Sequence, residues 1–367
     1  MRNNIWKTEM LGNVATLQRG YDLPYRQRKP GTVPIVTSSG IGDTHSESRV
    51  AGPGVVTGRY GTIGEVFYIR TDFWPLNTTL YVKDFHGNDP LFVSYLLRTI
   101  DFHSHSGKSG VPGVNRNDLH ELVVHLPPLA EQEAIAEALS DADALIEALA
   151  GVIAKKRQIK QGAMQALLTG KTRLPGFSGV WETCLIGDLL SIMHGKSQRT
   201  VEDLNGAYPI LASGGQIGKA NQFLYDKPSV MIGRKGTIDR PQYMDQPFWT
   251  VDTLFYSEIH GQNNAKFIFY QFCLIDWKQH NEASGVPSLN ARTIERIDLK
   301  VPQPAEQTAI AAILSDMDAE IAALEAKLVK ARQVKQGMMQ ELLTGRIRLI
   351  GGVETQDVAS VRGVAVT

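Results

Sequence analysis

The sequence predicts an α+β fold made of two small β-sheet domains with flanking helices and two long helices paired as an antiparallel coiled coil. Three observations predict it. The second half of the chain repeats the first at a constant spacing. Short β-rich runs alternate with turn residues early in each repeat, and a heptad pattern of apolar residues fills the rest. We expect the two copies to be related by an approximate two-fold axis.

The repeat has an offset of 175 residues wherever it can be read. Trp6 matches Trp181, and the run Gly-Arg-Tyr-Gly-Thr-Ile at 58–63 matches Gly-Arg-Lys-Gly-Thr-Ile at 233–238. Between residues 130–170 and 305–345, 26 of 41 positions are identical, whereas the preceding segments share only short islands. Each unit therefore has a divergent part and a constant part.

The divergent parts read as compact domains of ordinary size. Runs at 54–57, 65–69 and 79–82 are rich in β-formers and bounded by Gly, Pro and Asn. Helices are expected at 90–100 and 265–276. We place the domains at residues 1–129 and 175–304, the constant helical segments at 130–174 and 305–349, and a flexible tail at 350–367.

Each constant part predicts one long helix with a coiled-coil seam. Apolar residues step by four and three along both copies: Ile135, Leu139, Ala142, Ile146, Leu149 and Ile153, then Ile310, Leu314, Met317, Ile321, Leu324 and Leu328. A continuous helix from Glu131 to Thr169 would be about 58 Å long, at ~1.5 Å per residue.

Charge along both helices is polarised. All charged residues in 131–147 are acidic and all those in 155–173 are basic. In the second copy the charged residues are acidic from Glu306 to Glu325 and mainly basic from Lys327 to Arg348. An antiparallel pair would set each acidic half against the other's basic half, which holds the two domains apart. The alternative is that each helix carries this pattern to suit its own dipole.

Gly162 and Gly337 interrupt strong helix formers in the two copies. A mid-helix glycine costs about 1 kcal/mol relative to alanine. Either another backbone approaches closely at these positions or the helices kink there.

Composition bounds the function. With 367 residues, 43% hydrophobic and 21% charged, the chain is globular and long enough for two or more domains. Two cysteines without metal-site spacing and an N-terminus without an apolar stretch indicate a cytoplasmic protein that is neither exported nor membrane-spanning. A net charge of zero argues mildly against a non-specific nucleic-acid coat.

Motifs of catalysis and cofactor binding are missing. Asp89-Pro90-Leu91-Phe92 lacks the second proline of an amino-methyltransferase motif and reads as a loop entering a helix. The segment ending at Gly218 and Lys219 lacks the residues of a phosphate-binding loop. The third glycine of a cofactor-like loop, Gly64, is Asp239 in the second copy. The His103 and His105 pair becomes Lys278 and His280, which indicates surface histidines and no metal site.

The islands retained in both domains are Ser/Gly loops with a few bases. Small residues let a backbone approach phosphates, and Arg or Lys supplies counter-charge or a bidentate grip on guanine. Such loops suit a DNA groove. The alternative is a tight hairpin whose glycines supply positive φ and whose arginine is solvated. We favour the hairpin for the glycines and leave both readings open for Arg59 and Arg234. The predicted DNA contacts are Arg19, Tyr21, Ser38, Ser39, Arg59, Tyr60, Lys108, Ser109, Lys196, Ser213, Arg234, Lys235 and Ser284.

From Trp6 to about Leu349 the chain resembles the DNA-specificity subunits of type I restriction-modification systems. The resemblance rests on the duplication, on Leu-Pro-Pro-Leu-Ala-Glu-Gln at 126–132 and Val-Pro-Gln-Pro-Ala-Glu-Gln at 301–307, on Leu-Leu-Thr-Gly at 167–170 and 342–345, and on Leu-Pro-Gly-Phe-Ser-Gly at 174–179. The weak match of Lys108 with Ala283 makes that shared contact doubtful.

The resemblance implies a function. Each divergent domain would be a target-recognition domain that reads one half of a bipartite, asymmetric site in double-stranded DNA, and the helices would be a spacer that docks two methyltransferase subunits. Restriction subunits would join the larger complex. The chain itself would be non-catalytic and hold no cofactor or metal, with S-adenosylmethionine, ATP and Mg in its partners. We expect the docking surface to include Glu131, Gln132, Gly162, Glu306, Gln307 and Gly337.

Two other classes of function fit parts of the sequence. A stand-alone DNA-modifying enzyme would transfer methyl groups without partners, and a coiled-coil scaffold for protein interaction would leave DNA unprotected. Within the favoured class, the sequence does not separate a system with restriction and modification on different chains from one that joins them.

Overall fold

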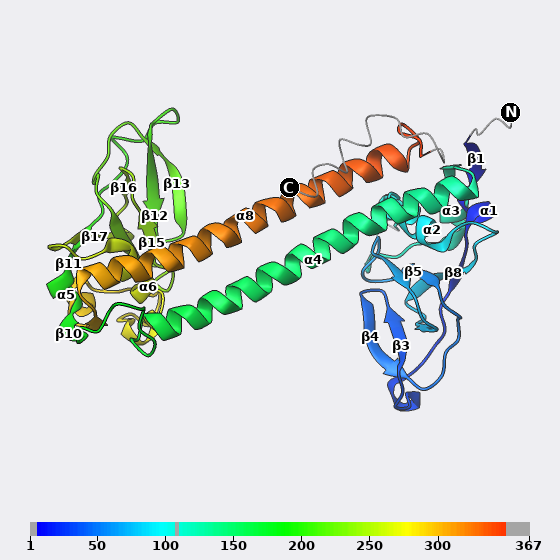
Figure 1. Cartoon of the computed structure of the whole chain (residues 1–367). Coiled ribbons are helices and arrows are strands. Elements are labelled where there is room, and N and C mark those ends of the chain that lie inside the picture. The colour runs from blue at the N-terminus through cyan, green and yellow to red at the C-terminus, as the bar shows by residue number, and fades with distance from the viewer. Residues whose placement is uncertain (1–5, 107–109, 350–367) are drawn as a thin grey trace. The chain divides into compact units, whose positions relative to one another are not determined.

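The computed structural model describes residues 6–106 and 110–349, and these form two compact units. Unit 1 runs to Leu149 and resumes at Lys327; unit 2 is Ala150–Ala326. Each unit therefore combines one divergent domain with parts of both long helices, α4 (Leu129–Leu167) and α8 (Pro304–Leu342) (Figure 1). The predicted tail, 350–367, lies outside the described residues, as do Lys108 and Ser109.

The domain of unit 1 contains three small sheets. A two-stranded antiparallel sheet joins β1 (Lys7–Met10) to β9 (Val123–Leu126). A four-stranded antiparallel sheet has the order β2 (Thr16–Arg19), β8 (Thr79–Asp84), β5 (Gly54–Gly58) and β6 (Val66–Ile69). A three-stranded sheet has the order β4 (Gly40–His45), β3 (Val33–Thr37) and β7 (Trp74–Pro75), with β3 and β7 parallel.

Short helices join these strands in unit 1: α1 (Leu11–Val14), the 3-10 turn η1 (Tyr25–Gln27), α2 (Pro90–Leu97) and α3 (Arg116–His120). Helix α2 begins as the sequence predicted. The Asp89 carboxylate accepts from Phe92 N at 2.6 Å, and Pro90 takes the first helical position, where its missing N–H is not needed. Asp89-Pro90 is thus a helix entrance.

Unit 2 repeats this architecture in the same order. Its two-stranded sheet pairs β10 (Glu182–Leu185) with β18 (Asp298–Val301). Its larger sheets have the orders β11-β17-β14-β15 and β13-β12-β16. The elements are α5 (Ile186–Leu189), β11 (Leu190–His194), β12 (Tyr208–Ala212), β13 (Gly215–Ala220), β14 (Ser229–Gly233), β15 (Gln242–Met244), β16 (Trp249–Thr250), β17 (Leu254–Ile259), α6 (Ala265–Phe272), η2 (Trp277–His280) and α7 (Ala291–Glu295).

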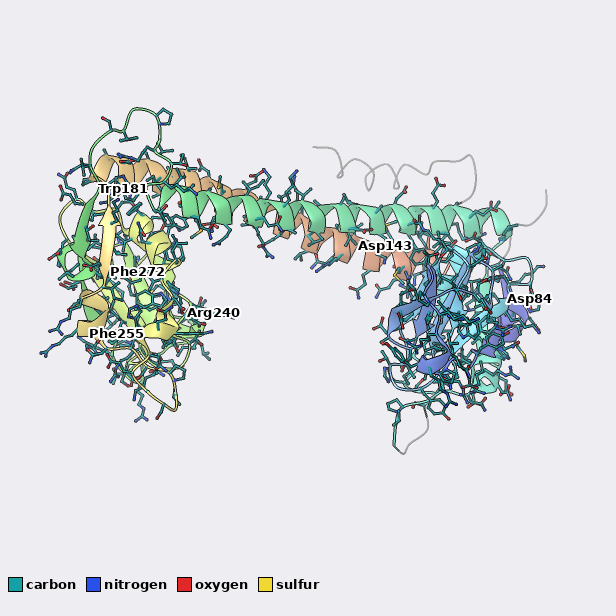
Figure 2. The ribbon with its side chains drawn as sticks, turned by 90° about the horizontal axis from the view of Figure 1, so that it is seen from below. Asp84, Asp143, Trp181, Arg240, Phe255 and Phe272 are labelled. Atoms are coloured by element: carbon teal, nitrogen blue, oxygen red, sulfur yellow. The ribbon has the colours of Figure 1, made fainter. Side chains whose placement is uncertain are left out.

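The sheets and long helices of each unit share a core. Strand β5 is buried along its whole length: Val55 packs with the α2 side and Val56 with Phe73 on the other face. In unit 1 this core continues through Ile135 and Leu139 of α4 to Leu342 of α8. In unit 2, Phe255 and Phe272 lie in the domain interior, whereas Arg240 is exposed (Figure 2).

The antiparallel pairing of the long helices is confirmed within each unit. In unit 1, Lys335 of α8 pairs with Asp143 of α4 at 2.5 Å. In unit 2, Arg157 pairs with Glu325 at 2.5 Å and Lys160 pairs with Asp318. As the residue number on α4 increases, the residue number of its partner on α8 decreases, which is the order of an antiparallel pair. Each pair joins a base of one helix to an acid of the other. The approximate two-fold relation between the units stays a prediction.

The predicted helix bounds are close to those observed. Helix α4 is continuous from Leu129 to Leu167, two residues earlier at each end than predicted. The apolar stripe of each helix begins in the core of a domain: Ile135, Leu139, Ile310 and Leu314 are buried against their own domains. The other positions of the stripe range from buried to half-buried. None of the helices in the described part of the chain is long and apolar enough to cross a membrane.

Candidate nucleic-acid interface

Three of the retained islands meet at one place in unit 1. They are the turn of the β3–β4 hairpin at 38–40, the loop after β5 at 59–64, and the loop at 110–114. The Gly61 N–H donates to the Pro112 carbonyl at 3.0 Å, and Val114 N donates to the Arg59 carbonyl at 2.9 Å. A Cβ on Gly61 would lie 3.7 Å from Ser38 Oγ, which places the hairpin turn beside the other two loops.

Unit 2 repeats the arrangement. Gly236 N donates to the Pro287 carbonyl at 2.9 Å, and Leu289 N donates to the Arg234 carbonyl at 2.9 Å. A Cβ on Gly236 would lie 3.3 Å from Ser213 Oγ. We call each set of three loops the loop cluster of its unit. Islands separated by some 70 residues in the sequence are thus neighbours in the fold.

Glycines in the loop clusters have a structural role. Gly61 and Gly236 have φ of 81° and 87°, a region that side chains avoid. A Cβ on Gly58 would lie only 1.7 Å from the Thr62 carbonyl oxygen, and one on Gly233 only 2.0 Å from that of Thr237. The hairpin interpretation of these glycines is therefore confirmed.

Contacts within the chain hold the two retained arginines. The Arg59 guanidinium lies over the Tyr60 ring, 4.6 Å from its centroid, and Arg234 Nη1 donates to the Asp252 carbonyl at 3.2 Å. Both side chains are half-buried. Neither pairs with a carboxylate among the described residues, so each keeps its positive charge available for an anionic ligand.

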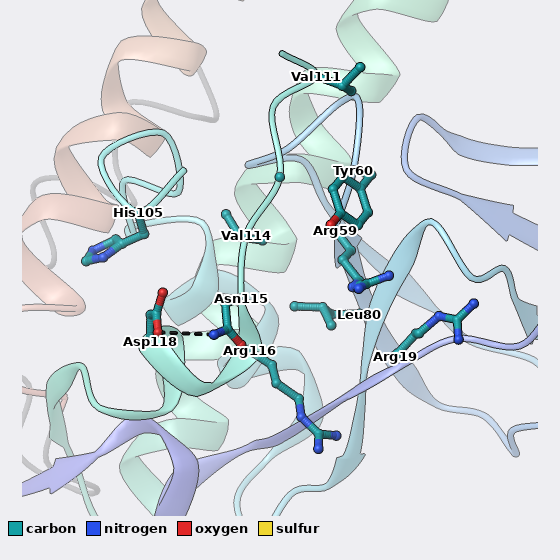
Figure 3. A pocket seen from close by; sticks show the side chains of 11 residues that line it. Arg19, Arg59, Tyr60, Leu80, His105, Val111, Val114, Asn115, Arg116 and Asp118 are labelled. Atoms are coloured by element: carbon teal, nitrogen blue, oxygen red, sulfur yellow. Dashed lines mark hydrogen bonds between the residues drawn. The ribbon is translucent and has the colours of Figure 1, made fainter. Parts of the chain in front are cut away.

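The loop cluster of unit 1 borders an open cavity of about 690 Å³. Arg19 of β2, Arg59, and Arg116 at the start of α3 line it, together with Tyr60 and Val111 (Figure 3). In this view the three arginine side chains lie on one side of the loop that carries Val114, with Asp118 and His105 on the other. The sequence did not single out Arg116. Its only signal was its place directly after Asn115, a retained residue.

The other predicted DNA contacts fall into two groups. Exposed side chains with room for a ligand are Ser39, Tyr60, Lys196, Lys235 and Ser284. Arg19 is held by Asp22 at 3.2 Å and is half exposed. Tyr21 is half-buried: its hydroxyl meets that of Tyr81 at 2.9 Å and its ring packs on Trp74, beside the core. Its contact with DNA stays a prediction.

Glu131, Gln132, Glu306 and Gln307 require a correction. All four were predicted to contact a partner, but they are 1–4% exposed. Gln307 donates from Nε2 to Asn263 Oδ1 and the Pro302 carbonyl, both at 3.0 Å, and accepts from Asn264 N at 2.9 Å. Gln132 makes the same three bonds in unit 1. These amides fasten each long helix to the N-cap of a domain helix.

The two glutamates are also internal. Glu306 binds Arg173 through both oxygens, at 2.7 and 2.6 Å, and Glu131 binds Arg348 with both distances 2.7 Å. Each arginine lies over a tryptophan, Trp181 or Trp6, the first residue pair of the repeat. The presence of these residues in both copies indicated that they matter, but it did not distinguish a buried contact within the chain from an exposed contact with a partner.

A second pair of clusters ties each domain to both long helices. In unit 1 the Tyr95 hydroxyl of α2 donates to Asp143 of α4 at 2.8 Å, and Lys335 of α8 pairs with the same carboxylate (Figure 2 labels Asp143). Burial raises the pKa of Tyr95, which keeps the hydroxyl protonated as a donor. Unit 2 repeats the cluster with Tyr270, Asp318 and Lys160.

The glycines inside the long helices face open space. Among the described residues, a Cβ on Gly162 or Gly337 would meet no atom within 4 Å beyond its own helix turn. Within that part of the chain no other backbone approaches them, and both lie within continuous helix. Their predicted contact with a partner stays a prediction. In the described residues, no group of three or more His, Cys, Asp or Glu side chains is placed to hold a metal ion.

His120 and its match in unit 2, Glu295, differ in charge but accept the same backbone hydrogen bond. Leu17 N donates to His120 Nε2 at 2.8 Å, and Ile192 N donates to Glu295 Oε1 at 2.9 Å. Burial, and secondly the charge of Arg116, lowers the pKa of His120, which suits its role as a neutral acceptor. This pair binds the end of α3 or α7 to the neighbouring sheet.

Two stretches, residues 3–157 and 179–331, match the family model of the type I restriction modification DNA specificity domain. The chain is 26% identical over 303 residues to the type I restriction enzyme MjaVIII specificity subunit of Methanocaldococcus jannaschii, covering 71% of this chain and 70% of that protein. It is 22% identical over 164 residues to the type I restriction enzyme EcoDI specificity subunit of Escherichia coli, covering 45% of this chain but only 37% of that relative. The crystal structure of a type I restriction-modification S subunit from M. genitalium shares the fold, with a TM-score of 0.72 at 17% identity and coverage of 94% and 97%.

Proposed function

Because the chain belongs to the family of type I restriction modification DNA specificity domains, as its motifs predicted, we propose that each of its two domains reads one half of a bipartite site in double-stranded DNA. The two domains differ in sequence, so the two half-sites differ and the target is asymmetric. The long helices act as the spacer between the half-sites.

The duplicated loop cluster is the observation that carries this proposal. Both units build it with the same hydrogen bonds from glycine to proline carbonyl and with one retained arginine. Small residues and backbone N–H groups suit close approach to phosphates, and an arginine suits a phosphate or a guanine. The side chains around the shared scaffold differ between units, which suits two different half-sites.

Catalysis belongs to partners in this proposal. Two methyltransferase subunits, which bring S-adenosylmethionine, dock on the long helices, and restriction subunits bring ATP and Mg. The open space beside Gly162 and Gly337 supports docking there, since a partner backbone can approach without meeting a side chain. A cytoplasmic location follows from the proposed ligand, the host's own DNA, and suits the free thiols of Cys184 and Cys273.

Methylome sequencing tests the proposal. The host would express this chain with its methyltransferase subunits, and the control would express the methyltransferase alone. We expect an interrupted, asymmetric methylated motif that appears only with the chain. Methyl transfer by the purified chain alone would instead establish a modifying enzyme. No DNA protected by the assembled complex would favour the protein scaffold.

A further inference from the structure

The two loop clusters divide into what the units share and what they do not. If the units read different half-sites, a shared residue serves what both half-sites have in common, the sugar-phosphate backbone. A residue that differs at a matched place on the same scaffold is free to serve sequence. This reasoning rests on the proposed function and extends it to individual side chains.

Three matched places around the clusters differ in chemistry. Tyr60 is replaced by Lys235 in unit 2, Arg19 by His194, and Arg116 by Ala291. The residues of unit 1 at all three places line the cavity beside the loop cluster. The retained arginine, Arg59, lines the same cavity and has its counterpart in Arg234.

Arg116 is the cation of this cavity that the chain itself holds least. It is exposed, and among the described residues it has no hydrogen bond, ion pair or ring partner. Arg19 is neutralised in part by Asp22, and Arg59 is stacked on Tyr60. The backbone around Arg116 is fixed, because the side chain of Asn115, the N-cap of α3, accepts from Asn117 N at 3.1 Å.

Charge makes an anionic ligand the fitting one. Three guanidinium groups and one carboxylate, that of Asp118, line the open cavity, so positive charge is in excess there and the guanidinium groups repel each other. A polyanion that enters the cavity removes the repulsion. A planar guanidinium also carries a fixed fork of donors, which matches the two acceptors, O6 and N7, on the major-groove edge of guanine.

We propose that Arg116 reads a guanine in the half-site of the first domain, while Arg59 and Arg234 contact the DNA backbone in both. Ala291, at the matched place in unit 2, is half-buried against the core of its unit and offers no donor. The second half-site therefore has no guanine read in this way.

The test uses the complete chain with its methyltransferase subunits and three variants of one exposed residue. Arg116→Ala removes the side chain, Arg116→Lys keeps the charge without the fork, and Arg116→Gln offers the donor and acceptor pair that matches adenine. Methylation is measured on a library of DNA sites in which every half-site position varies. The second half-site is the internal control in each experiment.

The alanine and lysine variants should each lose about 5- to 150-fold preference for guanine at one position of the first half-site, the range typical of a lost bidentate base contact. The glutamine variant should shift preference at that position towards adenine. The second half-site should not change. Arg59→Ala and Arg234→Ala should weaken methylation of all sites alike and leave both half-sites unaltered.

Three results would overturn the proposal. A lysine variant equal to wild type, with an alanine variant weakened uniformly across sequences, would make Arg116 a phosphate contact. Unchanged methylation in all three variants would return it to a solvated surface cation. Loss of subunit assembly in the absence of DNA would make it a protein contact. If the wild-type complex itself shows no selective methylation, the proposed function fails, which is a separate result.

Discussion

Replacing Gln307 by leucine tests how the long helix is fastened to the domain of unit 2. The amide is 1% exposed and makes three hydrogen bonds. Leucine fills a similar volume but makes none of them. The Asn263 side chain is half-buried and can turn to water, whereas the Asn264 N–H and the buried Pro302 carbonyl lose their partners. The two orphaned groups cost about 1–3 kcal/mol each and leucine burial offsets part of that cost, so we expect a net loss of about 2 kcal/mol.

Hydrogen exchange locates this loss. Amides of 264–272, which contain α6 and its cap, should exchange roughly 30-fold faster, since about 1.4 kcal/mol is tenfold. Helix α2 in unit 1 should be unaffected. Gln132→Leu should reverse the pattern because that amide makes the same bonds in unit 1. The control Ala312→Ser changes an exposed position of α8 and should alter exchange little. If the exchange rates of α6 rise less than about threefold in Gln307→Leu, Gln307 does not hold α6 to the long helix as we infer.

Three further predictions follow. Because the pKa of His120 is lowered in the fold, the stability that it gives to unit 1 is complete above about pH 6.5 and is lost as the pH falls below that. The free energy of unfolding, measured from pH 7 to 5, should depend less on pH in His120→Gln, which keeps an acceptor. An equal pH dependence in the variant and the wild type would contradict this. Gly162→Ala should stabilise the isolated chain by about 1 kcal/mol, measured by thermal melting, because alanine is the better helix former. The same variant should co-purify less well with the methyltransferase subunits. A lower melting temperature than that of the wild type would contradict the open space beside Gly162. With a net charge of zero, the chain alone should bind DNA weakly in a titration, and tight, selective binding without partners would contradict the division of labour.

The sequence predicted what depends on spacing. The offset of 175 residues fixed the order of elements in unit 2 from those in unit 1, and the heptad seam and polarised charge predicted the antiparallel helix pairs. The role of Gly61 and Gly236 was also predictable, because a glycine kept inside a hairpin loop points to a backbone that side chains would strain. These features are local or periodic, so the sequence alone carries them.

What the sequence did not predict depends on how the chain packs against itself. Glu131 and Gln132 begin a helix and looked accessible, but the helix docks on its own domain and buries them. The packing of Tyr21 on Trp74 and Tyr81 also has no signal in the sequence. Arg116 escaped notice because no repeat marks it, and only the fold brings it beside Arg59. Burial and convergence are tertiary properties, and a single sequence holds little trace of them.

A chimera shows whether each domain reads its half-site independently of the other. Residues 176–304 would replace 1–129, so that the second domain is attached to the long helices at both places. The two attachment sites match, because Gln132 and Gln307 bind their domains through the same three hydrogen bonds. Asp143 and Asp318 also each accept a hydrogen bond from a domain tyrosine. With the methyltransferase subunits present, methylome sequencing should show the second half-site on both sides of the spacer. A motif that keeps the original first half-site would contradict the account.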